Sequence, residues 1–228
     1  MKSNAILISF VLVTAPWLVL GHPFHQDPAY HDFADKESFL GIPNAANVLS
    51  NLPFAVVGLF GLCCLRGQNA LWKTLWIGLI LTAFGSGYYH LHPVNSTLAW
   101  DRLPMSITFA AVICIFLQDA FSQPSPPLAV WLACSVATVA YWAFTGDLRP
   151  YIILQFGGML FLVGAWLFRR STLPAWGWVL LGYVIAKILE AFDRSILVWT
   201  HGATGGHPWK HIAAAAGFIP LIFRRRRA

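Results

Sequence analysis

Charged residues are scarce in this sequence. Only 11% of its 228 residues are Asp, Glu, Lys or Arg, whereas a soluble globular domain carries about 25%. Hydrophobic residues make up 57%, and the mean hydropathy is +0.62. This shortage of charge, together with several long apolar runs, excludes an ordinary water-soluble core and predicts a polytopic membrane protein. No segment shows the ten-residue alternation of a membrane β-barrel, so the fold class is all-α.

Cysteine is rare as well. The chain has four cysteines, all inside apolar runs and without the spacing of metal ligands, so neither a disulfide nor a cysteine metal site is expected. We interpret Cys63, Cys64, Cys114 and Cys134 as small core residues. The net charge of +6 is explained by membrane topology, so no nucleic-acid partner is expected.

Eight apolar segments can be marked along the chain. Several approach the roughly 20 residues needed to cross a hydrocarbon core. In lipid each must be a helix, because the backbone has no water to pair with. The segments cover about residues 4–20, 45–65, 71–91, 103–118, 128–145, 150–168, 174–192 and 209–223.

Basic residues cluster on alternate sides of these segments. If successive helices cross the membrane in opposite directions, every basic cluster lies on the same side. The positive-inside rule identifies that side as the cytoplasm. The acidic residues collect on the opposite side. The sequence therefore predicts an integral multi-pass protein with a cytoplasmic C-terminus. The basic residues concerned are Lys2, Arg66, Lys73, Arg169, Arg170 and Arg224 to Arg227.

The chain divides into three parts on this interpretation. Residues 1–21 are either a cleaved signal peptide or an uncleaved anchor helix, since "LVLGH" is a poor cleavage site. Residues 22–43 form a polar extracytoplasmic segment. Residues 44–228 form a seven-helix membrane domain.

Polar residues with catalytic chemistry collect at the outer ends of three predicted helices. Ser86 and His90 are four residues apart and share one helix face, and Asp101 opens the next helix. His207 and His211 share a face in the same way. Pro208 suits the first position of a helix, so His207 is predicted to be its cap residue.

Each of these motifs has a simple structural alternative. A serine in a membrane helix often bonds its own backbone. Asp101 could pair with Arg102 or favour the positive end of its helix. Convergence at one depth nevertheless favours a shared function, because polar groups in a membrane usually face an interior site. Three imidazoles with an open fourth position are the ligand set of a catalytic zinc ion, with Asp101 and Ser86 placed to handle protons and hold water.

The same residues resemble a known family, the alkaline ceramidases, which belong to a superfamily of seven-helix membrane hydrolases that includes the adiponectin-type receptors. The resemblance lies in Ser86-x-x-x-His90, Asp101, His207-x-x-x-His211 and "NVLSNLPF" at residues 47–54. It implies a seven-helix bundle enclosing zinc, with His90, His207 and His211 as ligands and Asp101 and Ser86 beside the zinc-bound water. It also implies hydrolysis of the amide of ceramide or a related N-acyl lipid near the extracytoplasmic face, and so a role in sphingolipid metabolism.

The family also binds calcium in an acidic segment before the first core helix. Here "DFADKESFLGIPNAAN" offers Asp32, Asp35, Glu37 and Asn44, but it lacks the family's tryptophan and its spacing differs. Hard oxygen ligands suit calcium. A calcium site and a solvated acidic loop both remain open.

Other polar residues are given structural interpretations. Lys187, Glu190 and Arg194 form one stripe, predicted to be an ion-pair network, with contact to the substrate headgroup as the alternative. Asn44, Asn47 and Asn51 form another stripe, predicted to make interhelical hydrogen bonds. Outer-loop histidines are expected to be solvated, namely His22, His25, His31 and His201.

Three functions compete on the sequence alone. The first is a zinc-dependent lipid amide hydrolase, whose partners are an N-acyl lipid and the surrounding membrane lipids. The second is a non-catalytic receptor or scaffold with a structural zinc, which would need neither Ser86 nor Asp101. The third is a bis-histidine haem protein, in which Asp101 would have no part. The sequence does not identify the acyl chain, the amine or any protein partner.

Overall fold

The computed structural model describes residues 14–64, 68–121, 127–169 and 174–223, and within these ranges the regular structure is entirely helical. Seven helical units among the described residues coincide with the seven apolar segments predicted after residue 44. They are α2 (Ala45–Leu49) with α3 (Leu52–Cys64), α4 (Ala70–Leu91), α5 (Asn95–Phe121), α6 (Leu128–Thr145), α7 (Arg149–Ile152) with the π-helix η2 (Ile153–Gly157) and α8 (Gly158–Arg169), α9 (Pro174–Ala191), and α11 (Gly206–Gly217) with α12 (Ile219–Ile222).

Among the described residues, three shorter helical stretches lie outside these units. The 3₁₀ helix η1 (Pro28–His31) precedes the bundle, and α10 (Asp193–Trp199) links α9 to α11. A further helical stretch covers residues 14–20. It belongs to the segment predicted as a signal peptide or anchor.

Several helices are suited to a membrane. Among the described residues, four are long and apolar enough to cross one, at residues 45–64, 95–121, 128–145 and 149–167. The pair α9 and α10, bent by 74°, would make a fifth. By length and composition these helices are compatible with a multi-pass membrane protein. Of the predicted topology signals, Lys2, Arg66, Arg170 and Arg224 to Arg227 lie outside the described residues.

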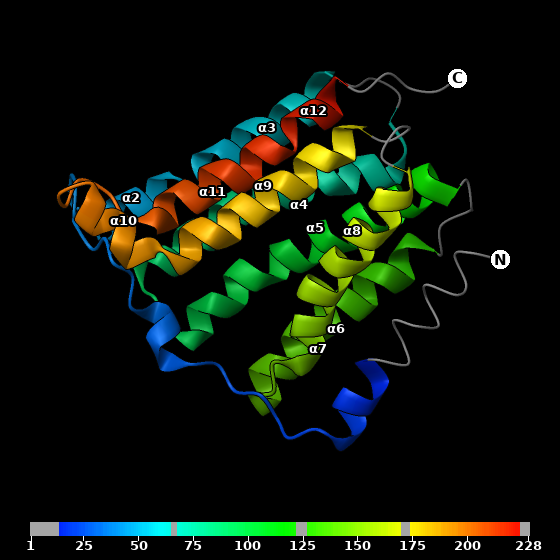
Figure 1. The fold of residues 1–228 in the computed structure, drawn as a ribbon, viewed down its shortest axis with the longest axis horizontal. Coiled ribbons are helices and arrows are strands. Elements are labelled where there is room, and N and C mark those ends of the chain that lie inside the picture. The colour runs from blue at the N-terminus through cyan, green and yellow to red at the C-terminus, as the bar shows by residue number, and fades with distance from the viewer. Residues whose placement is uncertain (1–13, 65–67, 122–126, 170–173, 224–228) are drawn as a thin grey trace.

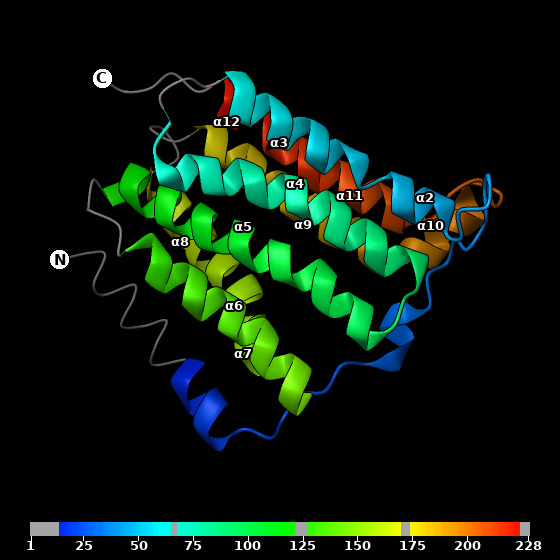
Figure 2. The same ribbon diagram turned by 180° about the vertical axis from the view of Figure 1, so that it is seen from behind.

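The helices form a ring. Going round it, α3 contacts α4, α4 contacts α5, α5 contacts α8, α8 contacts α9, α9 contacts α11, and α11 returns to α3. The helix α6 packs outside the ring against α5. In Figure 1, α3, α11 and α9 run side by side along the upper part of the molecule, and Figure 2 shows α4 and α5 on the opposite face. The ring leaves an interior in which a cavity can lie.

Apolar residues serve both the interior and the outer surface. Trp76, Trp176 and Phe116 belong to the buried core, while Phe144 is 91% exposed. A large exposed apolar side chain of this kind suits a lipid solvent. The prediction that the cysteines are core residues is therefore right only for Cys114; the other three are exposed, because apolar runs also supply the lipid-facing surface. All four are free thiols, as predicted.

A proline and a glycine set the close approach of α4 to α5. Pro104 lies inside α5, and because it has no backbone N–H it leaves the carbonyl of Trp100 without its helical partner. Gly85 of α4 faces that carbonyl: a Cβ added there would lie 2.2 Å from the Trp100 oxygen. This close approach puts Ser86, the residue after Gly85, beside the first turns of α5.

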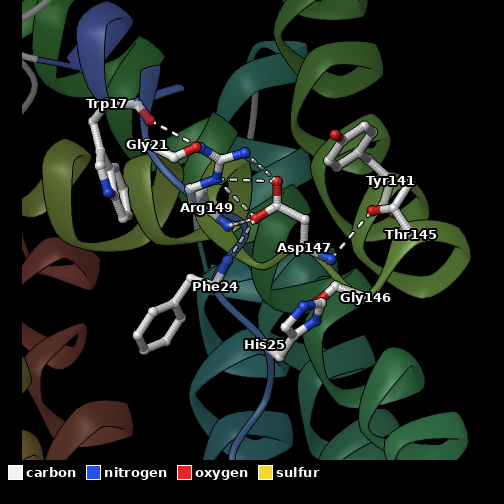
Figure 3. A network of polar contacts seen from close by, with 9 residues as sticks. All are labelled: Trp17, Gly21, Phe24, His25, Tyr141, Thr145, Gly146, Asp147 and Arg149. Atoms are coloured by element: carbon white, nitrogen blue, oxygen red, sulfur yellow. Dashed lines mark hydrogen bonds and ion pairs between the residues drawn. The ribbon is translucent and has the colours of Figure 1, made fainter. Parts of the chain in front are cut away.

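The segment before the bundle is anchored to the turn between α6 and α7. The Arg149 guanidinium donates to the carbonyls of Trp17, at 2.9 Å, and Gly21, which satisfies the last carbonyls of the helix over residues 14–20. Asp147 accepts a hydrogen bond from the Phe24 backbone at 3.2 Å and pairs with Arg149 at 2.8 Å. Figure 3 shows these contacts meeting around one buried ion pair.

Candidate metal centre

Three histidines meet at one end of the ring. His90 lies in the last turn of α4, and His207 and His211 lie in the first turns of α11. Each offers a ring nitrogen, and these atoms all lie within 4.8 Å of one another. All three side chains are buried. Histidines more than 100 residues apart in the sequence thus form one cluster, which could hold a metal ion.

The donor set of this cluster fits a divalent metal. Nδ1 of His90 and Nε2 of His207 are buried and have no hydrogen-bond partner among the described residues. A buried nitrogen without a partner costs about 1–3 kcal/mol. Coordination of one cation would satisfy both at once, and three imidazoles with an open side match the ligand set of a catalytic zinc site.

Ser50 orients the third histidine. Its Oγ donates to the Asn47 carbonyl at 3.1 Å and lies 2.8 Å from Nδ1 of His211. A hydroxyl has one proton, so Ser50 accepts from Nδ1–H and leaves Nε2 of His211 free for a metal. Sequence reasoning did not assign Ser50 a role, although it lies in the "NVLSNLPF" stretch.

His207 is held by residues before α11 rather than acting as the cap. The helix begins at Gly206 with Gly205 as its N-cap, so the prediction that His207 is the cap residue is wrong by two positions. The backbone N–H of His207 instead donates to Oδ1 of Asp193 at 2.9 Å. The Phe33 ring packs against both His90 and His207, with centroids 4.7 Å and 4.5 Å away. Neither Asp193 nor Phe33 carried a sequence signal.

Asp101 and Ser86 are neighbours beside the histidines. The Ser86 hydroxyl faces the Asp101 carboxyl across the contact between α4 and α5, and both residues line one cavity. Asp101 is 7% exposed, and its Oδ1 has no hydrogen-bond partner among the described residues. The alternative that Asp101 pairs with Arg102 is not realised, because no ion pair joins them. The free carboxylate oxygen remains available to a water or a substrate.

A cavity of about 450 Å³ reaches this site from the interior of the ring. Ser86, Asp101 and His211 line it. Much of the remaining wall is apolar, including Leu79, Val112 and Phe156. Such a cavity suits a ligand with a long apolar part and a polar group near the histidines.

A partly buried ion-pair cluster lies on the same cavity wall. Glu190 pairs with Lys210 at 2.6 Å and also with Lys187, and all three residues line the cavity. The predicted network is thus confirmed for Lys187 and Glu190. Arg194 is not part of it: it pairs with Asp32 instead, because the helical stripe is broken where α9 bends into α10.

The acidic segment considered for calcium is already engaged in other contacts. Asp32 pairs with Lys36 and Arg194, and Oδ1 of Asp35 accepts from the Glu37 backbone at 3.2 Å. Nδ2 of Asn44 donates to the carbonyl of His90 at 2.9 Å. The histidine cluster is the one group of at least three His, Cys, Asp or Glu residues in the described ranges that could hold a metal. Calcium binding here stays a prediction.

The asparagine stripe makes the predicted interhelical hydrogen bond at one of its three positions, Asn44. Asn44 reaches α4 through the His90 carbonyl, and Asn47 donates to the Asp35 carbonyl at 2.8 Å. Asn51 bonds within its own chain segment, to the Asn47 carbonyl. The expectation that His31 is merely solvated is wrong, because it bonds the Tyr89 hydroxyl at 2.9 Å.

These features define a class of protein: a helical bundle with membrane-suited helices that buries three histidines and a carboxylate at the polar end of an apolar cavity. The chain belongs to the ceramidase family, whose family model, described as Ceramidase, matches residues 41–173. That range includes Ser50, Ser86, His90 and Asp101, while His207 and His211 lie beyond it. Membership implies a hydrolase that acts on amide bonds and a lipid substrate. No curated protein and no solved structure matches the chain.

Proposed function

We propose that the protein is a zinc-dependent intramembrane hydrolase that cleaves the amide of ceramide or a related N-acyl lipid. The observation that supports this most directly is the histidine cluster, which lies at the end of a lipid-sized cavity in a chain of the ceramidase family. The products would be a fatty acid and a long-chain amine.

In this proposal His90, His207 and His211 hold the metal. A divalent ion bound there would supply Lewis-acid polarisation of the amide carbonyl and a water that ionises near pH 7. Ser50 and Asp193 would keep two of the ligands in place, since each is hydrogen-bonded to one of them. A contact with a ring nitrogen, as Ser50 makes, fixes ring orientation and ligand basicity, whereas Asp193 holds the backbone of His207.

Asp101 handles the protons of the reaction. Its free Oδ1 takes a proton from the attacking water and later gives that proton to the nitrogen of the leaving amine. The Ser86 hydroxyl, which faces the same carboxyl, positions Asp101. The water oxygen joins the acyl carbon as the carbon–nitrogen bond breaks, so one water is consumed for each amide.

The apolar cavity binds the acyl chain and excludes water from it. A receptor or scaffold with a structural metal is the competing function. It is less well supported, because Asp101 and Ser86 line the cavity beside the histidines, where a purely structural metal needs neither. We place this site near the extracytoplasmic face, with the C-terminus in the cytoplasm, following the distribution of basic residues.

Metal analysis of the purified protein, combined with turnover of a panel of N-acyl lipids, tests the proposal. The His211→Ala variant is expected to lose the metal and the hydrolysis together. Asp101→Asn is expected to keep the metal and to lose at least a hundredfold in kcat, in line with the usual contribution of a general base. Equal turnover by the parent protein and both variants would remove the hydrolase assignment. Bound metal with no turnover of any lipid would favour the scaffold.

A further inference from the structure

Arg102 is a buried cation without a carboxylate partner. Its side chain is only 6% exposed, and none of the ion pairs among the described residues includes it. Its Nη1 has no hydrogen-bond partner among those residues. A buried charge is normally paired, because its desolvation is costly. The free side of this guanidinium therefore needs an explanation.

Aromatic rings hold the guanidinium in a fixed position. Its Cζ lies 4.1 Å from the ring centroid of Trp142 and 5.0 Å from that of Tyr151, within the range of cation–π attraction. Nη2 donates to the side-chain oxygen of Gln26. These contacts occupy one nitrogen and the face of the group, but they leave the Nη1 donors unused. A planar guanidinium fixed in this way is suited to recognise an oxyanion.

The free donors belong to the cavity that the catalytic residues share. Arg102 lines the same cavity as its neighbour Asp101 and as Ser86 and His211. Gln26 and Tyr30, from the segment before the bundle, line it as well. Arg102 thus lies at the polar end of the cavity, where the amine half of a bound N-acyl lipid would project when its amide is at Asp101.

Apart from Asp101, whose Oδ1 is free, the other charges at this end are engaged with one another or with the backbone. Lys187 and Lys210 share the carboxylate of Glu190. Asp27 caps η1 by accepting from the Ala29 backbone at 2.9 Å. Among the described residues that line the cavity, Arg102 remains as the cation without a carboxylate partner.

We propose that Arg102 binds an oxyanion, a carboxylate or a phosphate, on the amine half of the substrate. This inference rests on the proposed function, and it makes the preferred substrate an anionic N-acyl lipid rather than a neutral ceramide. The guanidinium fixes the headgroup so that the amide lies beside Asp101, which makes Arg102 a specificity-determining residue.

Matched lipid pairs test this preference. N-palmitoylserine and N-palmitoylserinol differ only in a carboxylate against a hydroxymethyl group, and ceramide 1-phosphate and ceramide differ only in a phosphate. The parent protein is expected to turn over at least one anionic member with a kcat/KM at least tenfold above that of its neutral partner. The pair that shows the difference identifies the oxyanion. A ratio near one for both pairs would overturn the inference while leaving the hydrolase assignment intact.

Substitution of Arg102 tests the residue itself. Arg102→Gln is expected to lower the kcat/KM of the anionic lipid about tenfold to a hundredfold, mainly through KM, because a hydrogen bond to a charged group is lost. The neutral lipid should change less than threefold. Arg194→Gln is the matched control, since it removes an arginine that does not line the cavity, and it should keep the parent's preference.

The preference ratio is the kcat/KM of the anionic lipid divided by that of its neutral partner. Both values are measured on one preparation, so the ratio does not depend on the fraction of folded protein. If Arg102→Gln fails to fold, Arg102→Lys keeps the charge but loses the planar fork, and its ratio should fall threefold or more. A parent-like ratio in every folded variant would refute the role of Arg102.

Binding without turnover separates this inference from the proposed function. In the presence of a chelator, N-palmitoylserine or ceramide 1-phosphate should bind the parent protein at least tenfold more tightly than its neutral partner, and Arg102→Gln should abolish the difference. If this binding preference is found but no lipid is hydrolysed, the hydrolase assignment is wrong and the role of Arg102 still holds. Palmitate is tested in the same binding assay. If Arg102→Gln weakens the binding of palmitate but not that of N-palmitoylserine or ceramide 1-phosphate, Arg102 recognises the fatty-acid product and the headgroup role is wrong.

Discussion

Oγ of Ser50 lies 2.8 Å from Nδ1 of His211, although the two residues are 161 positions apart in the sequence. Both side chains are buried, at 8% and 5% exposure. Because the Ser50 proton goes to the Asn47 carbonyl, the contact selects the His211 tautomer with its proton on Nδ1. The turn between α2 and α3 therefore determines which nitrogen α11 presents to the metal.

Ser50→Ala should weaken metal binding without abolishing it. The substitution leaves the three ligands in place but removes the acceptor that orients His211, and loss of such a contact typically costs tenfold to a hundredfold in metal affinity. Zinc affinity, measured by competition with a chelator of known strength, checks this.

Ser135→Ala provides the control for that measurement. Ser135 is buried on α6 and lies outside the cavity lining, so its removal should leave zinc affinity within twofold of the parent value. An unchanged affinity in folded Ser50→Ala would contradict the orienting role of Ser50.

Gly85→Ala should destabilise the protein. The new Cβ would lie 2.2 Å from the Trp100 carbonyl oxygen and 2.9 Å from Pro104, so α4 and α5 would have to move apart. Overpacking of this kind costs about 1–3 kcal/mol, and it should also separate Ser86 from Asp101. Thermal unfolding in detergent, together with turnover, checks both effects.

Gly87→Ala is the matched control, two residues along the same helix. An added Cβ there meets nothing within 4 Å, and alanine is the better helix former by about 1 kcal/mol. The control should therefore be neutral or slightly stabilising. Equal melting temperatures for the two variants would refute the tight contact between α4 and α5.

Acid should loosen the anchor of the segment before the bundle. Hydrogen bonds from the Arg149 guanidinium lower the pKa of Asp147 from its usual 3.8 to about 2. A carboxyl whose pKa is lowered by folding stabilises the protein above its usual pKa, and this contribution disappears as the pH falls through about 4 to 2. We expect a loss of about 1 kcal/mol over that interval, discounted for partial solvent screening.

Asp147→Asn separates this contribution from the rest of acid unfolding. The variant has no charge to lose at residue 147, so its stability should start lower at pH 5 and fall less between pH 4 and pH 2. Unfolding curves recorded in that range give the difference. Parallel curves for the variant and the parent protein would show that the ion pair of Figure 3 does not stabilise the fold.

The sequence predicted the helical units and the shared face of His207 and His211, because both depend on local patterns. Apolar runs of spanning length must be helical in lipid, and a four-residue spacing puts His207 and His211 on one face. The family pattern connected that pair to His90 across the bundle. The exact start of α11 was missed by two residues, which is the usual uncertainty of helix ends.

The contacts that support the site could not be read from the sequence. Ser50, Asp193 and Phe33 reach the histidines from other elements, and no spacing rule links residues so far apart. Arg194 was assigned to the wrong network because the bend of 74° between α9 and α10 ends the helical periodicity. The exposed cysteines were misjudged because hydropathy alone does not distinguish a lipid-facing residue from a core residue.

The anchors of the segment that covers the polar end of the cavity come late in the chain. Contacts of Trp17, Gly21, Phe24 and Ala34 with Asp147, Arg149 and Asp193 join residues between 123 and 159 positions apart. During biosynthesis the covering residues are made long before their partners, and such distant contacts form late. The segment can therefore make all of these contacts only after the ribosome has passed Asp193.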